Sequence, residues 1–298
     1  MKSVGIIGVG NMGGGMARRL LSQGWSVHVR DVNAAVLAPL QALGAVVHSS
    51  PATLAEAVDR LIVCVVDAQQ MAETLFGAQG AANGLRLGQG VLLCPTISPE
   101  DTQNLGQRLS SLGAEPIDAP MSGGPARAEQ GTMSLMVACP DSVFEAHQDL
   151  LHALANPVFR ISERVGDGAR TKLVNNLLAG INLAGAAEVL ALAQRMGLDL
   201  TTTLDVMERS SGQSWIASDR MRRAIAGDYA PRAHMTLLEK DTRLAVEAAQ
   251  RAGVTPALGT QASAIFAQAS AAGFAKDDDA ALLKHLSAPS FTVIARHP

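Results

Sequence analysis

The chain is organised around GDGARTKLVNNLLAGINLAGAAEVLALAQRMG, the segment from Gly166 to Gly197. This segment contains no proline, and its residues from Ala169 to Met196 favour a helix. Such a helix would be about 40 Å long at a rise of about 1.5 Å per residue, which is enough to cross a whole domain. Its apolar residues do not keep to one stripe, and this predicts a helix that is buried on all sides.

Lys172 and Asn176 are polar residues in the first turns of this apolar helix. They are four positions apart, so they share one face of the helix. Two interpretations are open at this point. In the first, the lysine lays its apolar stem along the helix end and keeps its charge in water, while Asn175 and Asn176 cap a neighbouring element. In the second, the lysine is a buried amine placed for proton transfer.

The chain has 298 residues, which is enough for two domains with a sizeable core. Its formal net charge is −3 and it has no block of like charges, so we expect neither nucleic acid nor a membrane surface as a partner. No apolar run reaches the roughly 20 residues that a bilayer-spanning helix needs. The expected partners are therefore small molecules and other copies of the chain.

The cysteines and histidines indicate the redox compartment of the protein and whether it binds a metal. Cys64, Cys94 and Cys139 lie in separate apolar segments, and their odd number indicates reduced thiols in a cytoplasmic protein, not a disulfide framework. The seven histidines form no pair with metal-ligand spacing, so we expect no metal site.

A glycine-rich turn follows the first apolar run, Ser3 to Val9, and reads Gly8-Val-Gly10-Asn11-Met12-Gly13. Met16, Ala17, Leu20 and Leu21 then recur at helical spacing, so the motif stands between a strand and a helix. In this context Gly8 permits the tight turn, Gly10 lets the backbone approach a pyrophosphate, and Gly13 lets the helix pack on the strand. The start of the helix would present free N–H groups to the phosphates. The turn predicts a dinucleotide-binding site.

A second expected strand, Trp25 to Val29, is followed by Arg30, Asp31 and Val32. An acidic residue at this place can accept hydrogen bonds from the adenosine ribose hydroxyls and would repel a 2′-phosphate. Arg30 is the opposing signal, because an arginine can bind that phosphate, but its side chain should lie on the other face of the strand. The pattern favours NAD as the cofactor, with NADP as the alternative.

Apolar strands continue to alternate with helices through the first half of the chain. The expected strands are Arg60–Val66, Gly90–Cys94 and Glu115–Ala119, and the expected helices are Asn33–Leu43, Gln69–Phe76 and Pro99–Leu112. Strands that are apolar on both faces and alternate with helices predict a Rossmann-type doubly wound parallel sheet in the α/β class. Ligands of such sheets bind beyond the carboxyl ends of the strands. This places Val65, Val66 and Asp67 near the cofactor, and Thr96 either near the nicotinamide or in an ordinary loop.

Ser122, Gly123 and Gly124 form a second glycine-rich turn, which follows the strand ending near Ala119. Its successive N–H groups could bind a substrate carboxylate, or the segment could be a simple hairpin turn. Further strands, Thr132–Ala138 and Val158–Ile161, should extend the sheet. We therefore expect a dinucleotide-binding domain over residues 1–165.

After the long helix, residues 166–197, the strand signal almost disappears. The expected helices are Thr202–Ser210, Ser218–Ala226, Met235–Ala252, Leu258–Ala272 and Ala280–Leu286. Residues 166–298 are thus expected to form an all-helical domain for substrate binding and oligomerisation, whose tail from Ser287 to Pro298 carries no periodicity. A long helix that is apolar all round needs cover from every side, so we expect a homo-oligomer, a dimer or a tetramer.

Four motifs in this order resemble the β-hydroxyacid dehydrogenase family, which includes 3-hydroxyisobutyrate dehydrogenase, and the resemblance extends to about Leu286. They are Gly8-Val-Gly-Asn-Met-Gly13, Asp118-Ala-Pro-Met-Ser-Gly-Gly124, Gly166-Asp-Gly-Ala-Arg-Thr-Lys172-Leu-Val-Asn-Asn176 and Lys240-Asp241. The segments Pro95–Thr102, Gly212–Trp215, Gly227–Pro231 and Gly273–Lys284 look most like the L-threonate dehydrogenase branch. Pro95, Met121, Asn176, Glu239 and Thr242 depart from that pattern, which leaves the substrate open.

The resemblance implies a role for each matching residue. Lys172 would be the general acid/base and Asn176 its partner on the substrate. Ser122, Gly123 and Gly124 would hold the substrate carboxylate. Thr96 and Lys240 would contact the cofactor, while Asp241 would close the site and Trp215 would lie against the substrate.

The implied reaction is hydride transfer between a nicotinamide cofactor and a small 2- or 3-hydroxy acid, resembling L-threonate or 3-hydroxyisobutyrate. The alternatives within the family are a tartronate semialdehyde reductase and a dehydrogenase of β-hydroxy amino acids such as serine or threonine. An imine-reducing relative is disfavoured because such relatives generally lack the lysine. A non-catalytic dinucleotide-binding module would need the glycine turn and Asp31, but not Lys172 together with Ser122.

Overall fold

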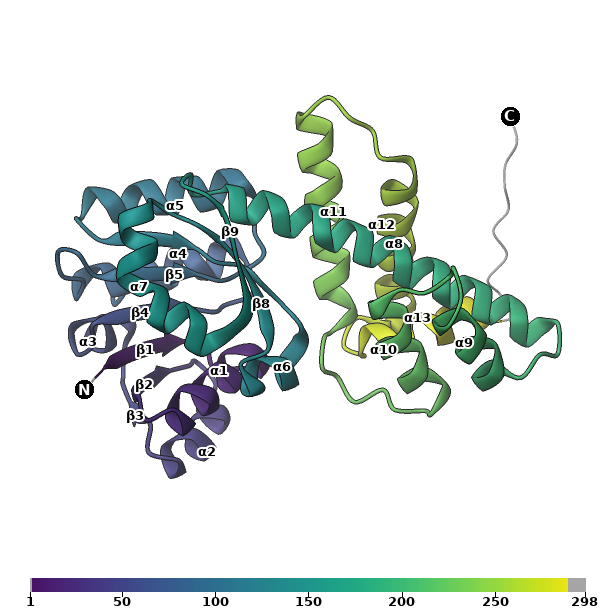
Figure 1. The fold of residues 1–298 in the computed structure, drawn as a ribbon, viewed down its shortest axis with the longest axis horizontal. Coiled ribbons are helices and arrows are strands. Elements are labelled where there is room, and N and C mark those ends of the chain that lie inside the picture. The colour runs from purple at the N-terminus through teal and green to yellow at the C-terminus, as the bar shows by residue number, and fades with distance from the viewer. Residues whose placement is uncertain (1, 289–298) are drawn as a thin grey trace. The chain divides into compact units, whose positions relative to one another are not determined.

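The computed structural model describes residues 2–288, so part of the expected aperiodic tail lies outside the described residues. Its internal contacts divide the chain into two compact units, one ending at Lys172 and the other beginning at Leu173. The dividing point falls inside one continuous helix, α8, Asp167–Arg195. The first unit contains the sheet, and the second is helical (Figure 1).

The first unit is built on one sheet whose strands lie in the order β3-β2-β1-β4-β5-β6-β8-β7, with β9 paired to β8. The strands are β1 Ser3–Ile7, β2 Ser26–Arg30, β3 Val46–Val47, β4 Arg60–Val63, β5 Gly90–Leu93, β6 Glu115–Asp118, β7 Met121–Ser122, β8 Met133–Ala138 and β9 Ala155–Ser162. From β3 to β6 every pairing is parallel, as expected for a doubly wound sheet. The expected fold class is confirmed.

Helices cover both faces of this sheet (Figure 1). They are α1 Asn11–Ser22, α2 Leu37–Ala42, α3 Pro51–Glu56, α4 Ala68–Phe76, α5 Pro99–Ser111, α6 Gly124–Gln130 and α7 Asp141–Leu154. Neighbouring strand residues point to opposite faces, so Ile6 packs with α1 and α7 while Ile7 packs with α3, α4 and α5. This alternation explains why these strands read as continuous apolar runs.

The sheet changes direction after β6, because β8 runs antiparallel to both β6 and β7. The extension of the sheet is confirmed, and β9 is longer than the expected Val158–Ile161. Helices α3, α6 and α7 are present in addition to the expected helices. For α7 the signal was present, since Val143, Leu150 and Leu154 recur at helical spacing and are buried.

The described residues of the second unit form helices joined by turns and loops, with an isolated bridge between His234 and Asp278. It comprises the later part of α8, then α9 Leu200–Glu208, α10 Trp215–Ile225, α11 Met235–Arg251, α12 Ala257–Ala269 and α13 Leu282–Ser287. Every expected helix is present within a few residues of its predicted bounds. Helices α11 and α12 lie side by side (Figure 1).

Helix α8 is present nearly as predicted, but it is not buried on all sides in the single chain. Leu183, Ala187 and Leu190 belong to the core of the second unit, whereas Val174 and Leu178 are exposed. By length and composition α8 could also cross a membrane, with a mean hydropathy of 1.5 over its best window, yet half of that window is buried in the protein. Core helices often have this composition, so it is weak evidence for a membrane span.

His28 in β2 and His48, just beyond β3, form a hydrogen-bonded pair at one edge of the sheet. Nδ1 of His28 lies 2.8 Å from Nε2 of His48, and the rings stack with centroids 5.1 Å apart. One ring must donate and the other accept, so the pair cannot be protonated on both facing nitrogens. Burial lowers the pKa of both histidines, and the neighbouring His48 lowers the pKa of His28 further.

We expect this pair to make the fold sensitive to acid. Because the folded-state pKa values lie below the unfolded value of about 6.5, the unfolded chain takes up protons first as the pH falls, and the free energy of unfolding decreases. The unfolding temperature should fall from pH 7.5 to 5.5 by less in His48→Gln than in the wild type. His152→Gln, a change of an exposed histidine in α7, is the control. Identical pH slopes in the wild type and His48→Gln would contradict the assignment.

Candidate active site

The glycine-rich turn joins β1 to α1, as the motif predicted. Gly8 donates its N–H to the carbonyl of Arg30 at 2.9 Å, which ties the turn to β2. A Cβ on Gly13 would lie 1.9 Å from the carbonyl oxygen of Gly8, so only glycine allows the helix to start this close to the turn. Asn11 and Met12 form the first residues of α1.

The start of α1 has the properties of a phosphate site. Its N-cap residue is Gly10, which has no side chain that could cap the first amides of the helix. A Cβ on Gly10 would meet nothing within 4 Å, so the backbone is open on that side. Uncapped amides at a helix start favour an anion. The turn therefore fits the pyrophosphate of a dinucleotide.

Asp31 stands directly beside this turn. Its Oδ2 accepts the N–H of Val9 at 2.7 Å, and its Oδ1 accepts the N–H of Asn33 at 2.8 Å. A carboxylate has further lone pairs, so Asp31 can hold the turn and still accept hydrogen bonds from ribose hydroxyls. The next residue, Val32, is 95% exposed.

The loops after β4 and β5 lie at the same edge of the sheet as Gly8, because β4 pairs with β1 and β5 pairs with β4, both in parallel. Val65 and Thr96 are half-buried there and Val66 is exposed. Asp67 has a structural task as well, since it is the N-cap of α4 and accepts the N–H of Gln70 at 2.8 Å. The structure thus groups these predicted cofactor neighbours at one edge.

The turn from Ser122 to Gly124 is the start of a helix and not a simple hairpin. Ser122 ends β7, α6 begins at Gly124, and both Gly123 and Gly124 have positive φ. Helix α6 packs on α1, where a Cβ on Gly15 would lie 3.0 Å from the carbonyl oxygen of Pro125. The second glycine turn is therefore attached to the helix that follows the first.

Lys172 and Asn176 are both buried and only 7% and 8% exposed, respectively. The lysine does not extend into solvent from the helix end, so the first of the two interpretations is wrong for this residue. Both side chains share the face of α8 that also carries the buried Leu183 and Ala187.

In the second unit, hydrogen bonds join Asn176 to the late motif Lys240-Asp241. Nδ2 of Asn176 donates to Oδ2 of Asp241 at 2.6 Å, and Nζ of Lys240 donates to Oδ1 of Asp241 at 2.6 Å. Asn175 donates to Oδ1 of Asn176 at 3.1 Å, a contact that the sequence reading missed. These bonds set the orientation of the Asn176 amide. Trp215 starts α10 and is half-exposed.

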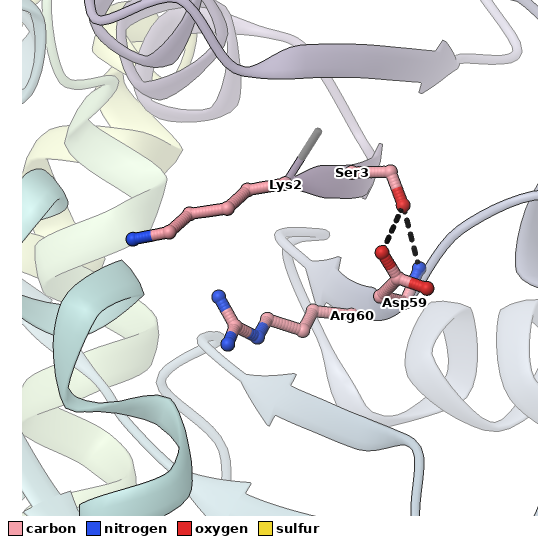
Figure 2. Close-up of a pocket in the computed structure, with 4 residues that line it drawn as sticks. All are labelled: Lys2, Ser3, Asp59 and Arg60. Atoms are coloured by element: carbon pink, nitrogen blue, oxygen red, sulfur yellow. Dashed lines mark hydrogen bonds between the residues drawn. The ribbon is translucent and has the colours of Figure 1, made fainter.

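A polar pocket at Lys2, Ser3, Asp59 and Arg60 lies at the opposite edge of the sheet, where β1 and β4 begin (Figure 2). Ser3 donates to Asp59 at 2.6 Å, as Figure 2 shows. Lys2 and Arg60 both pair with Asp149, at 2.8 and 3.0 Å. These charges are already matched, so the pocket does not resemble the predicted active site. No group of metal-ligating side chains occurs among the residues that the structure describes.

Comparisons with known proteins agree with this arrangement. Residues 3–163 match the family model of the NAD binding domain of 6-phosphogluconate dehydrogenase. Residues 166–286 match the model described as NAD-binding of NADP-dependent 3-hydroxyisobutyrate dehydrogenase.

Three similar proteins cover almost the whole chain. The L-threonate dehydrogenase of Cupriavidus necator is 37% identical over 95% of this chain and 95% of its own length. The crystal structure of a 3-hydroxyisobutyrate dehydrogenase from Salmonella typhimurium has a TM-score of 0.90 and 37% identity over 96% of this chain and all of its own. A structure described as Psf3 in complex with NADP+ and 2-OPP has a TM-score of 0.89 and 29% identity over 95% of this chain and 100% of its own.

Proposed function

Since the chain belongs to the β-hydroxyacid dehydrogenase family, which includes 3-hydroxyisobutyrate dehydrogenase, we propose that it oxidises a small hydroxy acid of the L-threonate type with NAD. The family assignment makes it a nicotinamide-dependent dehydrogenase that acts on a CH–OH group. The observation that carries the mechanism is the buried Lys172, one helical turn before the buried Asn176. We also propose a domain boundary at Val165, before Gly166, and a cytoplasmic location.

The residues at the carboxyl edge of the sheet fit a dinucleotide. The open backbone at Gly10 and the uncapped start of α1 would take the pyrophosphate, and Asp31 with Val32 would take the adenosine. The rest of the cofactor site would be lined by Val65, Val66, Asp67 and Thr96. When bound, the nicotinamide supplies the hydride chemistry, and the protein supplies position and proton transfer.

Lys172 is the residue to which we assign the proton. As a neutral amine, Nζ can take the proton from the substrate hydroxyl during oxidation. As an ammonium, it can donate a hydrogen bond to the carbonyl oxygen and return the proton during reduction. Burial favours the neutral form of an amine, which suits this exchange near neutral pH.

The other assigned residues hold the substrate in place. The N–H groups of the turn from Ser122 to Gly124 would donate hydrogen bonds to the substrate carboxylate, and Trp215 would lie against the substrate. The amide of Asn176 would hydrogen-bond the substrate oxygen or its carboxylate. Asp241 and Lys240 support this role because their hydrogen bonds restrict rotation of the Asn176 side chain. Lys240 is also assigned to the cofactor.

A homo-oligomer, a dimer or a tetramer, is part of the proposal. The exposed apolar residues of α8 and its end form a stripe: Val174, Leu178, Val189, Leu192 and Met196. At 3.6 residues per turn they fall within an arc of about 60° on the helix surface. A second copy would cover this stripe.

The substrate and cofactor are tested together with a panel of hydroxy acids and both nicotinamide cofactors. The panel contains L-threonate, glycerate, 3-hydroxyisobutyrate, 3-hydroxypropionate, serine and threonine. We expect L-threonate with NAD to give the highest kcat/KM, and NADP to be poorer by about tenfold or more, the effect of about 1.4 kcal/mol of repulsion at Asp31. Asp31→Asn keeps an acceptor for the N–H of Val9 but removes the negative charge. It should therefore reduce the ratio of kcat/KM with NAD to kcat/KM with NADP. Equal efficiencies with both cofactors, or a preference for NADP, would contradict the role of Asp31.

Lys172→Ala should lower kcat by about 10²-fold or more, because the reaction loses its general acid/base. NADH affinity should stay unchanged, since the glycine turn and Asp31 are intact. Lys172→Arg should be almost as slow, because a guanidinium does not lose its proton near neutral pH. The rate of oxidation should rise with pH in the wild type, and this rise should be absent in Lys172→Ala. Lys276→Ala, which removes an exposed lysine, is the control. A Lys172→Ala enzyme that keeps most of its activity would refute the assignment.

For the oligomer, light scattering at micromolar concentration should give at least twice the chain mass of 30.9 kDa. Replacing Leu178 and Leu192 by glutamate should shift the mass toward the monomer, because charges on the stripe oppose its burial. Exposed Leu87 is far from the stripe in sequence, and Leu87→Glu serves as the control. A monomeric wild type would rule out the oligomer.

A further inference from the structure

We infer that Asp118 is a positioning residue whose carboxylate anchors the first turn of α8 and thereby sets the position of Lys172. The inference rests on the proposed function of Lys172. Asp118 ends β6 and is only 1% exposed. It lies four positions before Ser122, in the segment expected to bind the substrate.

The hydrogen bonds of Asp118 cap α8 from a distance in sequence. Its Oδ2 accepts the N–H of Gly166 at 2.7 Å and the N–H of Ala169 at 3.1 Å. The intrahelical bonding begins at Gly166, whose carbonyl accepts the N–H of Arg170 at 3.0 Å. A helix start is normally capped by the side chain that precedes it, but Gly166 has none. One carboxylate from β6 thus satisfies both amides that a capping box would satisfy.

The glycines of this segment make the contact sterically feasible. Gly166 has a φ of +102°, a conformation that other residues rarely adopt. A Cβ on Gly168 would lie 2.9 Å from Cγ of Asp118 and 2.6 Å from the carbonyl oxygen of Met136. Any side chain at position 168 would therefore push the helix start away from the sheet.

Burial of the Asp118 carboxylate costs free energy, and its hydrogen bonds to the start of α8 offset part of that cost. Burial raises its pKa to about 7, while the hydrogen bonds from Ala169 and Gly166 oppose that rise. The nearby charge of Asp167 raises the pKa further. An apolar residue would avoid this cost but would leave the amides of Gly166 and Ala169 without their acceptor.

Lys172 lies three residues after Ala169, so the anchored amide and the lysine are less than one helical turn apart, about 4.5 Å along the axis. A helix is stiff over this length, and a displacement of its start moves Lys172 with it. Proton transfer requires accurate placement, and a shift of about 1 Å can lower the rate about 10²-fold. Asp118 therefore links the expected carboxylate turn to the expected acid/base.

Asp118→Ala, which removes the acceptor of both amides, tests this inference in the wild-type and Lys172→Ala backgrounds. In the wild type we expect kcat to fall about tenfold or more, with the KM for NADH changed less than about twofold. In the Lys172→Ala background the same change should lower the residual rate less than about twofold, because there is no amine to misplace. Asp199→Ala is the matched control: Asp199 caps α9, where it accepts the N–H of Thr202 at 2.7 Å.

Gly168→Ala is the second variant, because it displaces the helix start while Asp118 stays in place. Gly168→Ala should lower kcat by a similar factor in the wild type and have little effect in the Lys172→Ala background. Hydrogen exchange of the Gly166 and Ala169 amides should be faster in both the Asp118 and the Gly168 variants. Equal losses in the two backgrounds, or an unchanged kcat in Asp118→Ala, would overturn the inference. High activity of Lys172→Ala alone would instead refute the proposed function.

Discussion

The hydrogen bonds between the Asp118 carboxylate and the first amides of α8 are the interaction on which the candidate site depends. They attach the long helix to β6, the last strand of the parallel run from β3 to β6, at the edge of the sheet that the cofactor is expected to occupy. The segment after Asp118 continues directly into Ser122 and α6, and α6 packs against α1. One short piece of chain thus connects the proposed carboxylate turn, the helix that carries the proposed acid/base and the proposed nucleotide helix.

Close approach of backbones recurs wherever this site is assembled. Gly13 brings α1 against the glycine turn, Gly15 brings α6 against α1, and Gly168 brings α8 against Asp118. The glycines in these motifs are therefore required by the packing of the elements as well as by the proposed chemistry. In the proposed mechanism, these glycines let the elements approach closely enough for a few polar groups, above all Lys172 and Asn176, to act on one small substrate.

Local sequence patterns predicted the strand–turn–helix at Gly8, the doubly wound sheet and the extent of α8. They could not show the bond of Asp118 to Ala169 or that of Asn176 to Asp241, because these partners are distant in sequence. The prediction that α8 is buried on all sides, which rests on its hydrophobicity, is wrong for the single chain. Composition reports that a face is apolar, but it does not tell whether the same chain or another copy covers it, and Leu178 is exposed here.

Rescue of Lys172→Ala by added amines is the most direct test of the central claim that this side chain transfers the proton. Small primary amines should restore part of the oxidation rate in proportion to their concentration, with more basic amines acting more strongly at equal free-base concentration. Tetramethylammonium at the same ionic strength should restore nothing, since it carries charge but no exchangeable proton. If no primary amine raises the rate above this control, while NADH still binds, Lys172 is not the proton-transfer residue.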